Sequence, residues 1–490
     1  VLPGARFLGS PPPLTSACSD SREVRPGDWF FAIEGTKNDG HDHAAEALRR
    51  GAAGVVLERW IPDSAPQCLV EDTRVAFGLA SHALAGNPCR SMQVAGVTGT
   101  NGKTTTSHLL ASIFRAAGGR CGLTGTLGNH DGFELHPARL TTPSACELAE
   151  HLADSRDNGC SQAVLELSSH SLAQHRTAGL ELDVAIITNI RRDHLDFHRT
   201  LLNYRQAKRR ILGHLKTGGC AVVNADDAVC RQFLPQLDRP TLTYGLEHQA
   251  DVTAEVIERC GGEQTFLLNA GSETIAVRTR LMGDHNVSNC LAAATAALLL
   301  GVDLATIVRG LEAVTRLPGR MEPIVCGQPF GVYVDYAHTP DGLAAALSAA
   351  RRATRGRVIC VYGAGGDRDR DKRPLMGRAV ERYADLGIIT NDNPRSEEPL
   401  QIAHDILDGY ARPARAHVLP DRAEAIYFAL SQARPGDCVV IAGKGHEEYQ
   451  TIGRQQFYFD DREVARAWLN EQDSPLTDLE APATLPMYES

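Results

Sequence analysis

The sequence lacks three features, and each absence excludes a class of protein. None of its 13 Cys forms a C-x-x-C pair, so neither a zinc ribbon nor a thioredoxin-type motif is supported. The longest apolar stretch, LAAATAALLLG at 291–301, is far shorter than the ~20 residues that a membrane span needs, and it predicts a buried helix instead. The net charge of −10 argues against broad nucleic-acid binding, because phosphate backbones need a basic face.

The chain also has no signal-like start and no internal repeat. The odd number of scattered Cys and the missing signal predict a reducing cytoplasm. What is present is typical of a folded soluble protein, with 43% hydrophobic and 22% charged residues. With 490 residues and a prior of ~150 per domain, roughly three domains are expected.

Two junctions rich in Pro and Gly divide the chain. The first, 86–88, ends a turn-rich opening with a helix expected at 43–50, and the second is 317–320. From Met92 onward strands alternate with helices, which predicts a parallel sheet covered by helices. The expected strands are 92–99, 163–168, 183–189 and 220–227, with a helix at 103–117. The predicted divisions are an N-terminal domain 1–88, a central domain 89–317, a C-terminal domain 318–470 and a flexible tail 471–490.

Four further strands are followed by loops rich in Gly, Asp and Arg. They lie in the segments GVYVDYAHTP, RVICVYGAGGDRD, LGIITNDNPR and DCVVIAGKGHEE, which begin at residues 331, 357, 386 and 437. Ligands bind at the carboxyl ends of strands in open α/β sheets, so these loops predict one shared crevice. Taken alone, the D-N-P-R turn at 392–395 is equally well a polar turn or a ligand clamp.

The segment GVTGTNGKTTT, 96–106, is the strongest local signal for a nucleotide. A strand, a glycine loop and a helix that opens with Lys-Thr would cradle phosphates on backbone N–H groups. Lys103 would reach the terminal phosphates and Thr104 would coordinate Mg²⁺. Val97 departs from the strict G-x-x-x-x-G-K-[ST] pattern, and the segment fits G-x-x-G-K-T.

Three other positions are ambiguous from the pattern alone. Glu166 ends a predicted strand and could hold a metal ion, although a solvated strand end is the commoner reading. His194, between Asp193 and Asp196, is equally well a metal site or a polar loop. Lys208, in a helical stretch, is on pattern alone an exposed lysine.

Two Asn in HNVSN, 285–289, could present amides to a purine edge or cap a helix, and both interpretations remain open. The glycine loops 363–374 and 443–448 could serve anions, but such loops are weak evidence alone.

Eight ordered motifs resemble the Mur ligases over about residues 15–470. They are G-T-N-G-K-T-T, E-x-S-S-H, N-x-x-R-D-H-L-D, Y-x-x-A-K, H-N-x-x-N, G-R-M-E, D-Y-A-H-T-P and D-N-P-R. The resemblance implies an α/β protein of three domains: a smaller N-terminal domain for the UDP end of the substrate, a central P-loop ATPase-like domain with a parallel sheet, and a C-terminal Rossmann-like domain for the amino acid. Within the family the motifs look most like the branch that adds meso-diaminopimelate to UDP-MurNAc-L-Ala-D-Glu, with ATP and Mg²⁺. We expect a monomer without nucleic-acid partners.

The resemblance also assigns residues to roles. The ATP-binding residues implied are Gly99, Thr100, Asn101, Gly102, Lys103, Thr104, Thr105, Asn286, Asn289, Arg320 and Asp335. Metal ligands implied are Thr104, Glu166, His194 and Lys208, with Lys208 carbamylated and Lys103, Lys208 and His194 catalytic. The UDP-substrate residues implied are Ser19, Ser21, Thr36, Lys37, Asn38, Thr141, Thr142, Ser168, Gln174 and Arg176. Diaminopimelate would meet Arg368, Asp392, Asn393, Pro394, Arg395, Gly443 and Glu447. Leu140 stands where the family pattern has Asn.

The implied reaction activates a carboxylate as an acyl phosphate, which an amine then attacks. Such a site must close against water, and the junction 317–320 would supply the hinge. Arg395 can clamp the second carboxylate of diaminopimelate, which lysine lacks. The alternatives are a lysine-adding relative, a folylpolyglutamate-synthetase-like ligase, and a catalytically silent nucleotide-binding scaffold.

Overall fold

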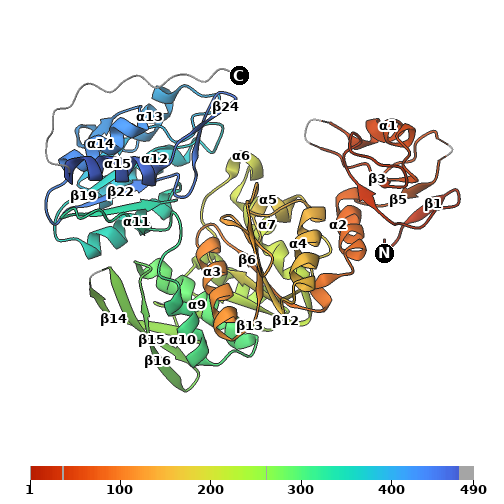
Figure 1. Ribbon diagram of the computed structural model, residues 1–490, viewed down its shortest axis with the longest axis horizontal. Coiled ribbons are helices and arrows are strands. Elements are labelled where there is room, and N and C mark those ends of the chain that lie inside the picture. The colour runs from red at the N-terminus through yellow and green to blue at the C-terminus, as the bar shows by residue number, and fades with distance from the viewer. Residues whose placement is uncertain (1, 36–37, 64, 261, 474–490) are drawn as a thin grey trace. The chain divides into compact units, whose positions relative to one another are not determined.

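The computed structural model describes residues 2–35, 38–63, 65–260 and 262–473. The chain divides into two compact units, Val1–Leu317 and Pro318–Ser490. Both are built of helices packed on largely parallel sheets, so the predicted α/β class is confirmed (Figure 1). The further division at residue 88 stays a prediction. The last described helix runs to Asp473, past the predicted start of a flexible tail, and the rest of that tail lies outside the described residues.

The N-terminal segment of unit 1 forms a five-stranded sheet of its own. The strand order is β1-β5-β4-β3-β2, with β1 Arg6–Leu8, β2 Ala17–Cys18, β3 Trp29–Phe31, β4 Gly54–Leu57 and β5 Gln67–Leu69. Only β1 is antiparallel to its neighbour. The helix expected at 43–50 is present as α1, Ala44–Arg49, after a 3-10 turn at Gly40–His43. Helix α2, Thr73–Leu84, contributes Phe77 to the core beside Trp29 and Phe31.

The large sheet of unit 1 has eleven strands in the order β16-β15-β14-β13-β12-β11-β6-β10-β7-β8-β9. The predicted strands are present as β6 Gln93–Thr98, β10 Gln162–Glu166, β11 Leu182–Ile187 and β12 Leu215–Asn224. They pair in parallel with one another and with β7 Cys121–Gly125 and β13 Thr241–Gly245. The parallel sheet expected from the alternation of strands and helices is therefore confirmed.

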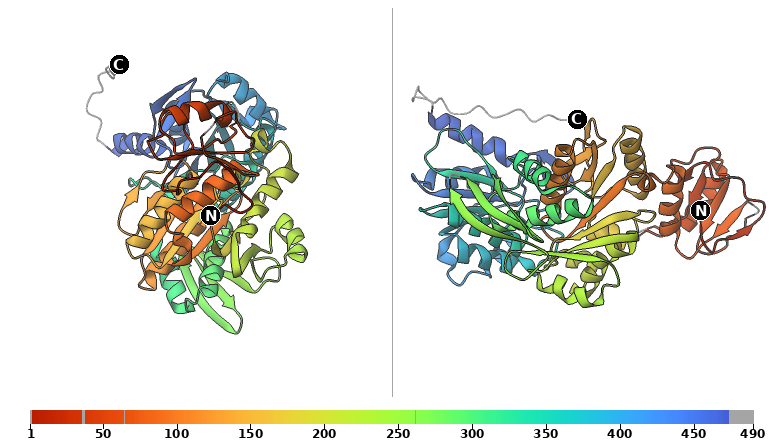
Figure 2. Two further views of the ribbon diagram at one scale, coloured as in Figure 1. Left: turned by 90° about the vertical axis from the view of Figure 1, so that its right-hand side faces the viewer. Right: turned by 90° about the horizontal axis from the view of Figure 1, so that it is seen from below.

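Both edges of this sheet turn antiparallel, which the sequence reading did not anticipate. On one edge are β8 Gly128–His130 and β9 Leu135–His136, and on the other β14 Val252–Cys260, β15 Glu263–Ala270 and β16 Glu273–Thr279. The last three form a long ribbon (Figure 2). Residues of β15 alternate between buried and partly exposed, the period of a half-buried strand.

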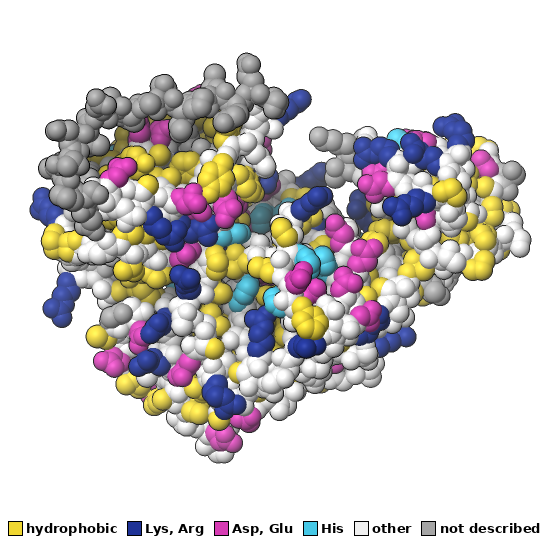
Figure 3. Space-filling view, viewed as in Figure 1, with side chains coloured by type: hydrophobic (Ala, Val, Ile, Leu, Met, Phe, Trp, Pro, Cys, Tyr) yellow, Lys and Arg dark blue, Asp and Glu magenta, His cyan; other side chains and the backbone are white. Residues whose placement is uncertain are grey.

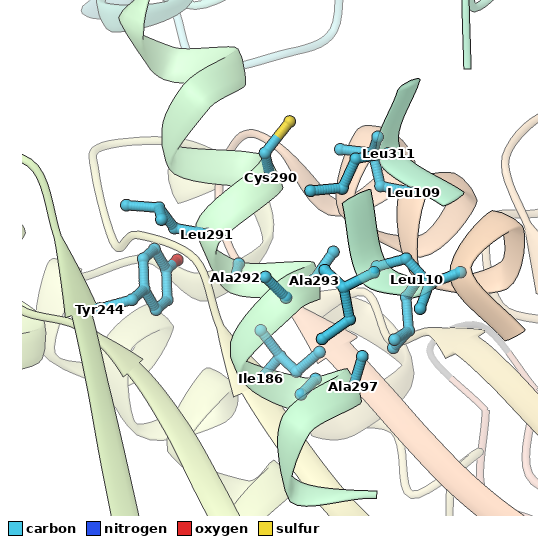
Figure 4. Packing of buried hydrophobic residues seen from close by; sticks show 14 of the residues in the cluster. Leu109, Leu110, Ile186, Tyr244, Cys290, Leu291, Ala292, Ala293, Ala297 and Leu311 are labelled. Atoms are coloured by element: carbon cyan, nitrogen blue, oxygen red, sulfur yellow. The ribbon is translucent and has the colours of Figure 1, made fainter. Parts of the chain in front are cut away.

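Helices cover both faces of the large sheet. One cover consists of α3 Lys103–Ala116, α9 Asp284–Leu299 and α10 Leu304–Ala313, and the other of α4 Ala145–Asp157, α5 Ser169–Ala173, α7 Leu201–Arg209 and α8 Ala228–Phe233. The predicted Ala/Leu helix is the core of α9, whose Ala293 and Ala297 face Leu110 (Figure 4). These small side chains let α9 approach the sheet and α3 closely.

Unit 2 contains a six-stranded sheet in the order β17-β18-β22-β19-β20-β21. Its strands are β17 Glu322–Pro323, β18 Gly331–Asp335, β19 Val358–Tyr362, β20 Leu386–Ile389, β21 Ala416–Val418 and β22 Cys438–Ala442. Helices α11 Pro340–Ala353, α12 Lys372–Tyr383 and α13 Pro399–Leu407 cover one face, and α14 Arg422–Gln432 and α15 Asp461–Asp473 cover the other. A hairpin of β23 Tyr449–Ile452 and β24 Gln455–Tyr458 follows β22.

The four strands predicted in this half, β18, β22, β19 and β20, are adjacent and parallel. Their carboxyl ends, with the four polar loops, therefore lie along one edge of the sheet, which confirms the placement expected for those loops.

The remaining features agree with the composition. All 13 Cys are free thiols. No helix within the described ranges is long and apolar enough to cross a membrane. On the face that Figure 3 shows, Lys and Arg side chains are scattered among Asp and Glu side chains.

His82 on α2 generates a prediction about pH. Its side chain is 1% exposed, and neither ring nitrogen finds a hydrogen-bond partner among the described residues. Burial lowers the pKa of His82 to about 4. Because the unfolded chain titrates near ~6.5, it binds more protons than the native state as the pH falls from there to 4, and stability is lost over that window. Between pH 7 and 5 this group alone costs about 2 kcal/mol.

We expect His82→Leu to flatten the dependence of the unfolding free energy on pH, measured by urea titration at pH 7 and 5. The control is Leu84→Ala at an exposed position of the same helix, which removes no titrating group and should leave the slope unchanged. An unchanged slope in His82→Leu would contradict the burial argument.

Candidate active site

The segment between β6 and α3 forms a tight loop that only glycine can build at two positions. A Cβ on Gly99 would lie 1.8 Å from Thr188 Oγ1. Gly102 has φ +86°, and its Cβ would lie 2.3 Å from Asn289 Oδ1. The loop is thus wedged between the end of β11 and helix α9, and α3 begins at Lys103 directly after it. This is the strand, glycine turn and helix arrangement expected of a phosphate-binding loop.

Two lysines converge on one carbonyl of that loop. Lys103 Nζ donates to Gly99 O at 2.8 Å, and Lys208 Nζ donates to the same oxygen at 2.7 Å. Lys208 is 1% exposed, so its interpretation as an exposed helix lysine is wrong. Burial, and then the charge of Lys103, hold the pKa of Lys208 well below its ordinary range. A buried lysine with a lowered pKa therefore lies beside the loop.

Glu166 is fully buried at the end of β10, so it is not a solvated strand end. Its carboxylate accepts hydrogen bonds from Thr104 Oγ1 at 2.9 Å and from the backbone N–H of Thr126 at 3.0 Å. The contact joins the first turn of α3 to the strand end, and it brings two of the expected metal ligands together.

His194 precedes α6, Leu195–His198, in a left-handed conformation with φ 54°. Its ring lies edge-on to His170, with centroids 4.7 Å apart, and Nε2 lies 3.3 Å from Asp193 Oδ2. Among the described residues no group of three or more His, Cys, Asp and Glu side chains is placed to hold a metal ion. Any metal here would depend on other oxygen donors, such as Thr104 or a modified Lys208.

The two Asn of HNVSN lie inside α9, whose N-cap is Gly283, so the helix-cap interpretation is wrong. Both side chains are buried. Asn286 Nδ2 donates to Met282 O at 2.8 Å, and Asn289 Nδ2 donates to Asn286 Oδ1 at 3.1 Å. They border the phosphate loop through Gly102, which suits the predicted adenine side of the site but does not test it.

The residues expected to hold the muramoyl peptide also cluster beside Glu166. Thr142 Oγ1 donates to the Glu166 carbonyl at 2.7 Å and accepts from the Ser168 N–H at 3.0 Å. Arg176 is largely buried and donates to Thr142 O, and burial lowers its pKa. Thr141 accepts a hydrogen bond from Thr126 at 3.1 Å, and Gln174 is the C-cap of α5. The side chain that departs from the family pattern, Leu140, is exposed.

The residues expected at the uridine end lie in the N-terminal sheet region. Ser19 is exposed, Ser21 Oγ donates to Glu46 Oε2 at 3.3 Å, and Asn38 O accepts from Gly35 N–H at 2.8 Å. Thr36 and Lys37 lie outside the described residues. These five assignments stay predictions.

In unit 2 the D-N-P-R turn presents Arg395 with unusual backbone geometry. Arg395 has φ 52°, and its Nη1 donates to Gly366 O at 2.8 Å. Among the described residues no carboxylate forms a salt bridge with it. A Cβ on Gly365 would lie 2.8 Å from Arg395 Nη1 and 3.6 Å from Arg368 Cγ, so the two arginines flank that glycine. Burial, and then the like charge of Arg368, lower the pKa of Arg395. Such a pair is suited to an external carboxylate.

The same turn is joined to the loop after β22. Asn393 Nδ2 donates to Glu447 Oε2 at 3.0 Å, and a Cβ on Gly443 would lie 2.6 Å from Asp392 Oδ2. Burial, and then Asp392, raise the pKa of Glu447. Lys444, which the sequence reading missed, is fully buried, and its Nζ lies 3.4 Å from Glu447 Oε2. Its position between two glycines of G-K-G was the available signal. Pro394 is buried beside these residues.

The two residues expected to complete the nucleotide site are neighbours in unit 2. Asp335 accepts hydrogen bonds from the N–H groups of Met321 at 2.7 Å and Ala337 at 2.8 Å. The guanidinium of Arg320 lies over the ring of Tyr336, 4.8 Å from its centroid. The structure therefore brings most of the predicted residues together in two groups, one around the glycine loop and Glu166 in unit 1 and one at the strand ends of unit 2, while Ser19, Ser21 and Asn38 belong to the N-terminal sheet region.

These features define an α/β protein with a glycine loop of the phosphate-binding type in unit 1 and a group of polar loops at the strand ends of unit 2. Three family models match the chain: "Mur ligase family, catalytic domain" at 15–67, "Mur ligase middle domain" at 97–297 and "Mur ligase, glutamate ligase domain" at 319–445. The chain belongs to the Mur ligase family.

Individual relatives agree with this assignment. UDP-N-acetylmuramoyl-L-alanyl-D-glutamate--2,6-diaminopimelate ligase of Geobacillus thermodenitrificans is 44% identical over 95% of this chain and 96% of its own length. A solved structure of a protein with that name is 36% identical, covers 94% of this chain and 96% of its own, and has a TM-score of 0.67. MurF ligase from Thermotoga maritima, solved in complex with ADP, shares the fold at 22% identity and a TM-score of 0.64, covering 93% of this chain and 98% of its own.

The glycine loop generates the prediction for this site. We expect Gly102→Ala to weaken binding of a non-hydrolysable ATP analogue by about tenfold or more, because the new Cβ is strained at positive φ and collides with Asn289. The matched control is Gly118→Ala, which has φ +85° and open space around its Cβ. Calorimetric titration measures the affinity of both variants for the analogue. Gly118→Ala carries the strain of a positive φ without a collision, so it should bind as the wild type does. A Gly102→Ala affinity equal to that of the wild type would contradict the assignment of this loop.

Proposed function

We propose that this protein joins meso-diaminopimelate to the D-Glu carboxylate of UDP-MurNAc-L-Ala-D-Glu, at the cost of ATP, in peptidoglycan precursor synthesis. The relatives named above support this reaction at 36–44% identity over nearly the whole chain. The observation that carries the choice of amino acid is Arg395, a half-buried guanidinium without a carboxylate partner among the described residues.

The reaction needs activation, because a free carboxylate is a poor electrophile. A carboxylate oxygen of D-Glu attacks the γ-phosphorus of ATP, and ADP leaves with the electron pair of the broken P–O bond. The amine of diaminopimelate then attacks the acyl carbon, loses a proton, and expels phosphate as the amide forms. Negative charges converge in both steps, and preorganised cations stabilise them.

The residues of unit 1 would stabilise the negative charge that develops in these steps. The N–H groups of the loop 99–105 and the ammonium of Lys103 bind the phosphates. Thr104 and Glu166 offer the hard oxygen donors that Mg²⁺ prefers, with His194 and a modified Lys208 completing the predicted set. Mg²⁺ bound there would supply positive charge to the phosphates. Asn286 and Asn289, which border this loop, would bind the adenine of ATP.

Lys208 is suited to carbamylation by its environment. Only a neutral amine attacks CO₂: its nitrogen bonds to carbon and releases a proton, leaving a carbamate. Burial and the charge of Lys103 lower the pKa of Lys208, which favours the neutral amine, and the charge of Lys103 would offset the new negative charge. The modification also turns a group that cannot bind Mg²⁺ into an oxygen ligand.

Unit 2 binds and selects the incoming amino acid. Arg395 and Arg368 bind the second carboxylate of diaminopimelate, and Asp392, Asn393 and Glu447 bind its ammonium. Lysine would leave the guanidinium of Arg395 without a counter-charge, which costs on the order of several kcal/mol. A lysine-adding enzyme is therefore the second candidate, and it is disfavoured by Arg395. The protein would act as a cytoplasmic monomer.

The substrate proposal is tested by phosphate release with UDP-MurNAc-L-Ala-D-Glu, ATP and either meso-diaminopimelate or L-lysine. We expect diaminopimelate to be used at least about 100-fold more efficiently, because of the unpaired guanidinium in the lysine complex. Arg395→Ala should lose most of that preference while KM for ATP stays unchanged.

The control is Arg415→Ala, at an exposed position outside the strand-end loops, which should behave as the wild type. Equal use of the two amino acids by the wild type would contradict the choice of substrate. Parallel losses for ATP and diaminopimelate in Arg395→Ala would contradict the role of that residue.

The carbamate is tested by ¹³C NMR of protein equilibrated with ¹³C-bicarbonate. We expect one slowly exchanging carbamate resonance that is absent in Lys208→Met, and activity that falls when the buffer is stripped of CO₂. Lys216→Met, a partly exposed lysine of the same unit, is the control and should keep the resonance. A spectrum without the resonance in active wild-type protein would rule the modification out.

A further inference from the structure

A fully buried arginine lies beneath the loops that present Arg395. Arg373, in the first turn of α12, is 0% exposed. Its guanidinium donates to Glu397 at 2.8 and 3.0 Å and to Asp405 Oδ2 on α13 at 2.8 Å. None of these three side chains belongs to the ligand-binding set described above. A charge that costs so much to bury needs an explanation beyond packing.

Glu397 links this arginine to the glycine loop after β19. Its Oε1 also accepts the backbone N–H of Asp367 at 2.6 Å. Asp367 has φ 54°, and its Oδ1 accepts from Ser396 Oγ at 2.6 Å. Asp367 therefore fastens the loop 363–371 to two adjacent residues of the segment 391–397, Ser396 and Glu397.

The fastened position decides where Arg395 can point. Its Nη1 donates to Gly366 O, the carbonyl that directly precedes Asp367. The N–H of Gly366 in turn donates to Asn393 O at 2.9 Å, and a Cβ on Gly366 would lie 1.9 Å from Pro394 O. Any shift of this loop therefore moves the acceptor that orients the Arg395 guanidinium.

We propose that Arg373, Glu397 and Asp405 form a positioning unit that aligns Arg395 and so sets selectivity for an amino acid with a second carboxylate. The identity of that amino acid rests on the proposed function. Glu397 holds the loop to the arginine, and Arg373 is held to the fold by Asp405 on α13. Because Asp405 remains as a counter-charge, loss of Glu397 alone leaves the buried guanidinium paired and the sheet intact.

The test compares Glu397→Ala and Glu397→Gln with a matched control. The control is Asp437→Asn, which removes a carboxylate that pairs with Arg357 at 2.7 Å. Asp437 and Arg357 directly precede β22 and β19, at the end of the sheet opposite the loops. The control variant therefore removes a comparable ion pair without altering the loops.

We expect Glu397→Ala to raise KM for diaminopimelate by roughly 10- to 100-fold, because small misplacements of a binding group have costs of this size. The preference over lysine should fall in parallel, while KM for ATP and for the UDP-dipeptide stays unchanged. Glu397→Gln should recover part of the loss, since its amide oxygen still accepts the Asp367 N–H. Asp437→Asn should lower thermal stability without altering selectivity.

Two outcomes would overturn the proposal. One is an unchanged KM and selectivity in Glu397→Ala, and the other is equal losses for every substrate in Glu397→Ala and Asp437→Asn, which is the pattern of a purely structural role. Failure of the wild type itself to use diaminopimelate is a separate result, and it would contradict the proposed function instead.

Discussion

The carbonyl of Gly99 accepts hydrogen bonds from two lysines, and the position of the glycine loop in unit 1 depends on that contact. It fixes the glycine loop against α7 as well as α3, since Lys208 lies on one helix and Lys103 on the other. Burial, and then the charge of Lys103, lower the pKa of Lys208 well below its ordinary range. The charge of Lys103 and the lowered pKa of Lys208 suit the negative charge that we propose for this site, from phosphates and from a carbamate.

In unit 2, buried arginines hold the loops at the strand ends in place. The groups that we propose to bind the amino acid lie on loops, which are mobile unless fastened. Buried arginines do the fastening: Arg373 beneath one pair of loops, and Arg422, which pairs with Asp461 at 2.7 Å and donates to the carbonyls of Asn391 and Ala442. Each guanidinium has several donors in a fixed plane, so one side chain can hold two loops and a helix together. The strand ends then present Arg395 and Glu447 from fixed positions.

The strands and the loops that follow them could be predicted from local sequence patterns. Short β-branched runs that end in Gly and Asp located β6, β18, β19, β20 and β22, because strand and loop chemistry change abruptly there. Sequence reasoning could not find the antiparallel ribbon β14–β16, whose pairing depends on long-range register. It also misjudged burial: pattern alone favoured an exposed Lys208 and a solvated Glu166, yet both are buried. Only the resemblance to a family singled them out. Arg373 was missed because a buried cation without a local motif is visible only once its partners are placed, whereas the G-K-G setting of Lys444 was a sequence signal.

The most direct test of the phosphate-site account is a crystal structure of the protein with ADP and Mn²⁺, solved with anomalous diffraction. The account predicts the diphosphate on the N–H groups of residues 99–105 and a metal peak about 2.1 Å from Thr104 Oγ1 and from a carboxylate oxygen of the carbamate on Lys208. Diphosphate bound away from this loop, with the Lys208 amine unmodified on Gly99 O, would contradict it.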